Sequence, residues 1–143
     1  MSTERLQQAL AAVPFLGTLS LRVDQAQPGS VVMSLNQNPS LLDHAGHVHS
    51  SALFALGESA AAVALGTHPA LEKRTQLQHA CGIRYFKACA GSPSAKAHID
   101  LEQIHQIEEE LSASGMAKTE VIVSIENDKA EQLAEVIAVF SIQ

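Results

Sequence analysis

The segment from Ala52 to Leu65 constrains the fold more than any other part of the chain. It is a helix-forming run of mostly alanine and leucine that carries one charged residue, Glu58. Its apolar residues occupy both faces of a helical wheel, so we expect a helix that is buried on all sides. Because the charge and its small neighbours interrupt the run, it does not qualify as a membrane span. The rest of the chain must therefore wrap this helix, and Ser50 or Ser51 is expected to cap it.

Segments with the alternating apolar and polar residues of half-buried strands flank this helix on both sides. The first two are close enough to form a hairpin at Pro28–Gly29, and Asn127–Asp128 is expected to turn the chain into the last strand. Strands are expected over residues 19–26, 30–36, 82–90, 94–101 and 118–126. In the final segment, residues 129–134 favour helix and residues 136–142 favour strand, and we expect a strand because it is the natural partner across the turn.

Two further segments have helical spacing of their apolar residues. One covers residues 3–13, where Pro14 is expected to end it, and the other is a short exposed helix from Ile104 to Leu111 that ends near Gly115. Residues 36–49 are rich in Asn, Pro, Asp, His and Gly and are expected to form a loop.

Composition limits the classes of protein to which the chain can belong. With 143 residues, 46% of them hydrophobic, it is expected to form one domain over residues 1–143. The net charge is −6 and no basic cluster exceeds Lys73–Arg74, so we expect no nucleic-acid partner. The segment from Met1 to Val13 does not follow the pattern of a signal peptide, and we expect a cytoplasmic protein without a membrane partner.

Cysteine and histidine residues give little support for a metal site. Cys81 and Cys89 do not form a CxxC pair and are expected to be small buried hydrophobic residues. His44, His47 and His49 could be interpreted as a metal cluster, but their spacing follows no established ligand pattern. We therefore expect neither a metal nor a cofactor.

The order of the elements and one motif together resemble a known family. His49-Ser50-Ser51, followed by Leu56 and Glu58, looks like the HGGxxxxLxD/E signature of acyl-CoA thioesterases in the phenylacetyl-CoA thioesterase branch. The resemblance covers nearly the whole chain. It implies the hotdog fold, an α+β fold in which a curved antiparallel β-sheet wraps around a long central helix.

The resemblance also implies an activity and a site. The activity is hydrolysis of an acyl-CoA or related acyl thioester to the free acid and CoA. Glu58 would be the catalytic carboxylate, as nucleophile or as general base for water, and the backbone N–H groups of Ser50 and Ser51 would stabilise the oxyanion. The donors and the carboxylate would come from different subunits of a homodimer, and such dimers commonly pair into tetramers.

The sequence departs from the family pattern at three places. Ser50 and Ser51 replace two glycines, Asp43 stands where the family often has asparagine, and the segment 85–88 lacks the usual proline. Asp43 and His49 are nevertheless expected to position the substrate. Arg84 and Lys87 are the expected contacts for the phosphates of coenzyme A.

Other interpretations remain open from the sequence. Glu58 could be a structural acid, His49 could only orient its loop, and Ser50, His79 and Glu58 could form a hydroxyl, imidazole and carboxylate set. A noncatalytic hotdog domain that binds acyl-CoA or fatty acyl ligands is the alternative function. The scarcity of aromatic residues, one Tyr, four Phe and no Trp, favours an aliphatic acyl group over an aryl one.

Overall fold

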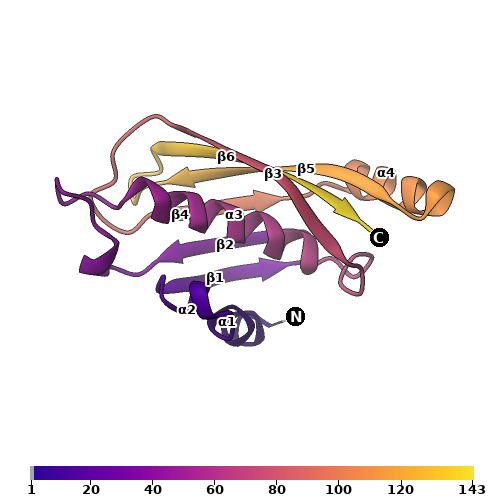
Figure 1. Ribbon diagram of the computed structural model, residues 1–143, viewed down its shortest axis with the longest axis horizontal. Helices are drawn as coiled ribbons and strands as arrows, with labels where there is room; N and C mark the ends of the chain where they lie inside the picture. Colours follow the sequence, from indigo (N-terminus) through magenta and orange to yellow (C-terminus); the bar gives the residue numbers. More distant parts are fainter. Residues whose placement is uncertain (1) are drawn as a thin grey trace.

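The computed structural model describes residues 2–143 (Figure 1). All six strands form one antiparallel sheet in the order β1-β2-β4-β5-β6-β3. In chain order the elements are α1 (Thr3–Ala11), α2 (Pro14–Gly17), β1 (Leu21–Gln27), β2 (Ser30–Leu35), the 3₁₀ turn η1 (Pro39–Leu41), α3 (Ser50–Gly66), β3 (Gln76–Tyr85), β4 (Ser94–His98), α4 (Leu101–Ser114), β5 (Ala117–Glu126) and β6 (Gln132–Ile142).

The long helix α3 lies across one face of the sheet, which confirms the predicted arrangement (Figure 1). It packs against β2, β4, β5 and β6, and the main core lies between the helix and these strands. Gly57 allows the close approach, because an added Cβ there would collide with the Val136 side chain of β6. The largest fully buried side chains include Met33, Leu35, Leu56, Leu65, Ile125 and Ile142.

The expectation that this helix is buried on all sides is wrong for one stripe. Phe54, Glu58, Ala62 and Val63 are only half-buried, whereas Ala60 and Ala64 are fully buried. The other strands of the sheet cover the rest of the helix. β3 lies at the edge of the sheet and makes few contacts with α3, so it does not cover this stripe. The stripe that contains Glu58 is therefore open.

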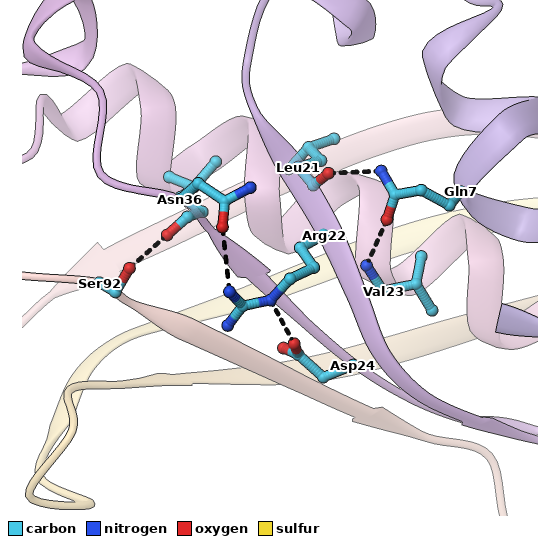
Figure 2. Close-up of polar contacts among 8 residues, drawn as sticks. Gln7, Leu21, Arg22, Val23, Asp24, Asn36 and Ser92 are labelled. Atoms are coloured by element: carbon cyan, nitrogen blue, oxygen red, sulfur yellow. Dashed lines mark hydrogen bonds and ion pairs between the residues drawn. The ribbon is translucent and has the colours of Figure 1, made fainter. Parts of the chain in front are cut away.

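The two edges of the sheet differ. At β1, the Gln7 side chain of α1 donates to the Leu21 carbonyl oxygen at 2.6 Å and accepts from the Val23 N–H at 2.8 Å (Figure 2). This side chain satisfies backbone groups that a further strand would otherwise bind. At the other edge, β3 pairs with β6 alone among the described elements. The β3 edge is thus the open one.

Several predicted boundaries are confirmed and others are wrong. The first hairpin turns at Pro28–Gly29, and Gly29 has a positive φ of 75°. β3 begins at Gln76 instead of Gly82, because its pairing with β6 starts from Gln76 opposite Ile142. An edge strand is exposed on both faces, so its residues lack the alternation that marks a half-buried strand.

The helical segments also differ in detail from the predictions. Pro14 starts the short helix α2 instead of ending the helical region, since proline is well tolerated in a first turn. The fourth strand ends at His98, because Asp100 caps α4 by accepting from the Gln103 N–H. α4 is longer than predicted, and its buried side chains are Ile104, Ile107 and Leu111, whereas Leu101 is exposed. None of the helices formed by residues 2–143 is long and apolar enough to cross a membrane.

Candidate active site

The start of α3 is capped by His49 and not by Ser50 or Ser51. The His49 Nδ1 atom accepts from the Ser51 N–H at 3.0 Å, and the His49 carbonyl oxygen accepts from the Ala52 N–H at 2.9 Å. The predicted serine cap is wrong, because the His49 imidazole nitrogen accepts the hydrogen bond that a serine hydroxyl oxygen was expected to accept. Among residues 2–143, no acceptor lies within hydrogen-bond distance of the Ser50 N–H. Of the two predicted oxyanion donors, only that of Ser50 is therefore free.

Glu58 lies on the open stripe of α3 and faces the edge strand. Its Oε2 atom accepts from the Gln78 Nε2 of β3 at 2.9 Å. Cys81 of β3 is near enough for the Glu58 charge to act on its thiol: burial, and secondarily this charge, raise the pKa of Cys81 to about 11. Cys81 is thus half-buried beside the carboxylate, whereas Cys89 is buried as predicted.

A second contact joins β3 to the start of α3. The Tyr85 hydroxyl donates to the Ser50 carbonyl oxygen at 2.8 Å. The edge strand therefore reaches the helix both at the free donor and at the carboxylate. The Gln78 contact is not predicted from the sequence, because Gln78 lies outside the strand expected over residues 82–90.

The free donor and the carboxylate of one protomer are far apart. Glu58 follows Ser50 by eight residues, which is about 12 Å along a helix at about 1.5 Å per residue. A catalytic carboxylate and an oxyanion donor must both lie within roughly 3 Å of the reacting groups. This backbone separation accords with the predicted use of the two groups by different subunits, which stays a prediction.

Asp43 organises the loop that precedes α3. Its Oδ1 atom accepts from the Ala45 N–H at 2.9 Å and from the His47 N–H at 3.0 Å. The hydrogen bond from the His47 backbone is the main reason why the pKa of Asp43 is lowered. This carboxylate closes a turn, and a role in positioning the substrate stays a prediction.

A cavity of about 450 Å³ lies under this loop, next to the start of α3. The loop is anchored at its first residue, where Arg22 donates to the Asn36 Oδ1 at 3.0 Å (Figure 2). Val48, two residues before Ser50, reaches the cavity. The lining is mostly aliphatic with three amide side chains and includes Leu35, Asn36, Gln37, Asn38, Leu41 and Leu42.

The predicted contacts for coenzyme A lie at the end of β3. Lys87 forms an ion pair with Glu131, and both side chains are about half exposed. Arg84 is exposed and stands opposite Glu135 in the β3–β6 pairing. It follows Ile83, which faces α3, so Arg84 belongs to the opposite face of the sheet. Their contact with coenzyme A stays a prediction.

Two alternative sets of residues are not assembled in the protomer. The His79 Nε2 atom lies 2.8 Å from the Ser141 Oγ, and no hydrogen bond links it to Ser50 or Glu58 among the described residues. In the same part of the chain, residues 2–143, no group of three or more His, Cys, Asp or Glu side chains is arranged to hold a metal ion.

Solved structures share this fold over almost their full length. A protein of unknown function from Pseudomonas aeruginosa, described as a probable thioesterase, matches with a TM-score of 0.89 and 23% identity, over 100% of this chain and 96% of its own. A thioesterase from Haemophilus influenzae matches with a TM-score of 0.78 and 13% identity, over 100% and 91%. A mutant of the phenylacetic acid degradation protein from Thermus thermophilus matches with a TM-score of 0.68 and 21% identity, over 90% and 97%.

These likenesses confirm the predicted hotdog fold, a curved antiparallel sheet around a central helix. At such low identities they are evidence for the fold alone. No curated protein matches the chain in sequence. A family model does match residues 3–141, and the chain therefore belongs to the family described as a domain of unknown function, DUF4442.

Proposed function

We propose that the protein is an acyl-CoA thioesterase, which hydrolyses an acyl thioester to the free acid and CoA. The observation that carries the proposal is Glu58, the one carboxylate on an otherwise apolar helix, which faces an open stripe next to the edge strand. The names of the similar structures, a thioesterase from Haemophilus influenzae and a probable thioesterase from Pseudomonas aeruginosa, support the same reaction class.

The proposed chemistry uses the backbone N–H group of Ser50, at the start of α3, and the carboxylate of Glu58, eight residues further along the helix. The Ser50 N–H binds the thioester oxygen as negative charge develops on it, helped by the positive end of the helix dipole. Glu58 either attacks the carbonyl carbon or removes a proton from a water that attacks it. In the first route the C–S bond breaks to leave an acyl anhydride on Glu58, which water then hydrolyses to the free acid and the carboxylate. In the second route the water oxygen bonds to the carbonyl carbon, Glu58 holds the water proton and the C–S bond breaks. In both routes the CoA thiolate leaves and takes up the proton released by the water.

The proposed active unit is a homodimer, because Ser50 and Glu58 of one chain are too far apart to act on one thioester. The open β3 edge offers the surface for pairing two copies about a twofold axis. If the axis passes near Cys81, Gln78 of one copy lies opposite Tyr85 of the other. Since Tyr85 holds Ser50 and Gln78 holds Glu58, this pairing brings the donor of one copy towards the carboxylate of the other. A dimer of dimers stays a prediction.

The proposed substrate is an aliphatic acyl-CoA. The mostly aliphatic cavity beside Val48 is next to the Ser50 donor and is suited to an acyl chain. His49 and Asp43 would position the thioester from the same loop, while Arg84 and Lys87 would contact the CoA phosphates. The cytoplasmic location also stays a prediction.

One observation favours the noncatalytic alternative, in which the domain binds acyl-CoA or a fatty acyl ligand without cleaving it. The Ser51 N–H is already bonded to His49, which leaves a single backbone donor for the oxyanion. A site with one donor is a weaker oxyanion hole, although it still binds a carbonyl oxygen.

The substitution Glu58→Gln separates the two functions. Wild-type protein is tested against CoA thioesters of short, medium and long straight-chain acids and of an aryl acid. We expect Glu58→Gln to lower hydrolysis by roughly 10²-fold or more, because the general base or nucleophile is lost, while the melting temperature changes little. Glu72→Gln, at an exposed position after α3, is the matched control. Binding of acyl-CoA without turnover by the wild type, or full turnover by Glu58→Gln, would reject the proposal.

A further inference from the structure

β3 contains a β-bulge that changes which of its side chains face the helix. Gln78 pairs with Phe140 and Ala80 with Val139, so His79 has no partner residue across the ladder. Ile83 pairs with Val136, the residue that meets Gly57, and this identifies the helix-facing side of the strand. Strict alternation would place Gln78 on the other side. The extra residue instead puts Gln78 on the helix-facing side together with Cys81 and Tyr85.

The bulge is held in place by a side-chain contact. The His79 Nε2 atom lies 2.8 Å from the Ser141 Oγ of β6. β-bulges commonly re-aim a side chain beside a functional site, and here the re-aimed residue is the one that reaches Glu58.

We propose that Gln78 is a positioning residue for Glu58, re-aimed at the carboxylate by the bulge at His79. This inference rests on the proposed function, since it assigns a role to Gln78 in that reaction. The Gln78 amide donates to one oxygen, Oε2, and Oε1 accepts no hydrogen bond from any residue in the range 2–143. One oxygen is thereby fixed while the other remains available to the thioester or to the attacking water.

The hydrogen bond is also the contact that orients the carboxylate. No lysine or arginine of residues 2–143 forms an ion pair with Glu58. The Gln78 amide is therefore the side chain that holds the Glu58 carboxylate in place.

The test replaces Gln78 with methionine, which has a similar length and no N–H donor. We expect kcat to fall roughly tenfold, the lower range for loss of a hydrogen bond to a charged group, with KM nearly unchanged. In a Glu58→Gln background, adding Gln78→Met should lower the remaining rate no further, because the two residues act as one unit.

A second measurement does not depend on turnover. The ¹³C signal of the Glu58 carboxyl group, assigned by its absence in Glu58→Gln, should shift at neutral pH in Gln78→Met, because the hydrogen bond to Oε2 is lost. Gln132→Met, on β6, is the matched control, because it removes an amide that donates to the Ser124 hydroxyl of β5. It should change neither the rate nor this signal.

The outcomes distinguish this inference from the proposed function. If wild type hydrolyses acyl-CoA and Glu58→Gln does not, an unchanged kcat and an unchanged Glu58 signal in Gln78→Met would overturn the positioning role alone. A higher KM with unchanged kcat would also overturn it, since Gln78 would then bind the substrate. If wild type hydrolyses no thioester, the proposed function fails, and the Glu58 signal still decides whether Gln78 holds the carboxylate.

Discussion

Gly57 sets the distance between the central helix and the sheet, one residue before Glu58. An added Cβ would overlap the Val136 side chain and would lie 3.3 Å from the Ile125 Cδ1. Both side chains are fully buried, so neither has free space into which to move. The absence of a side chain at Gly57 thus helps to fix where Glu58 stands relative to β3.

We expect Gly57→Ala to destabilise the fold by about 1–2 kcal/mol, within the range for overpacking a core, although alanine is the better helix former. Gly66→Ala is the matched control on the same helix. Its Cβ would meet only the Gln76 side chain at 3.8 Å, an ordinary contact, so stability should stay equal or rise slightly. Urea unfolding of both variants measures the difference. Equal stability of Gly57→Ala and wild type would show that the helix can move away from β6.

The loop from residue 36 to residue 49 leads to the candidate donor at Ser50 and is held by side-chain and backbone contacts. The Asp43 carboxylate closes the turn at Ala45 and His47, and the Leu42–Val48 bridge and the bond from the Val48 N–H to the Cys89 carbonyl oxygen hold its end. The start of α3 is therefore positioned by a loop in which the Asp43 side chain accepts two hydrogen bonds.

The lowered pKa of Asp43 predicts how this loop responds to acid. A group whose pKa is lower in the folded state stabilises the fold above its ordinary value of 3.8, and this contribution is lost as pH falls through the lowered pKa. We expect the amide proton shifts of Ala45 and His47 to change in that acidic range. In Asp43→Asn the amide oxygen still accepts both bonds, so this titration should disappear while the loop stays ordered.

Asp43→Ala is the contrasting variant, because it removes the acceptor as well as the charge. The amides of Ala45 and His47 should then exchange faster at neutral pH. Amide shifts that titrate equally in wild type and in Asp43→Asn would contradict the assignment. Wild-type rate and pH profile in Asp43→Asn would show that Asp43 holds the loop and takes no part in the reaction.

In the molecule as a whole, one edge of the sheet is covered by a side chain and the other edge is open. Gln7 satisfies backbone groups of β1, whereas β3 presents its free side next to Glu58 and Ser50. An edge strand with free backbone N–H and C=O groups favours pairing with a strand of another chain. The same edge would both join two copies and bring together the two halves of the proposed site.

Sedimentation at micromolar concentration should show a dimer or a larger assembly, and a complementation experiment tests the shared site directly. Ser50→Pro removes the candidate N–H donor at the first position of α3, where proline is favoured, so the helix should persist. Glu58→Gln removes the carboxylate. Each variant alone should be inactive. When both are mixed and allowed to exchange subunits, heterodimers contain one intact site, and about a quarter of wild-type activity should return.

A site contained within one protomer would give no recovery in the mixture, because neither chain has both groups. Sedimentation of a monomer alone, together with full activity, would likewise contradict the shared site. If Ser50→Pro is active on its own and only Glu58→Gln is inactive, the Ser50 N–H is dispensable for hydrolysis.

Local sequence patterns determined most of the elements. Local patterns predicted strands close to β1, β2, β4 and β5, and the alanine-rich run predicted α3, because burial of a strand or helix face constrains the choice of residue. The last strand was expected as the partner across the turn at Asn127–Asp128, and β6 lies there. The motif from His49 to Glu58 and the order of elements predicted the fold, which the solved structures confirm. Glu58 stood out for a simple reason: a charge in an apolar helix is costly without a partner or a function.

Only the tertiary structure decided which groups meet. The partners of Glu58 and Ser50 are Gln78 and Tyr85, which lie 20 and 35 residues away in the chain. Their approach depends on the pairing of β3 with β6 and on an unpaired residue at 79. No local pattern encodes a bulge of this kind, because it follows from the register of two strands distant in sequence. For the same reason, the carboxylate Glu58 could be predicted from the sequence, whereas the side chain that binds it and the open edge of the sheet could not.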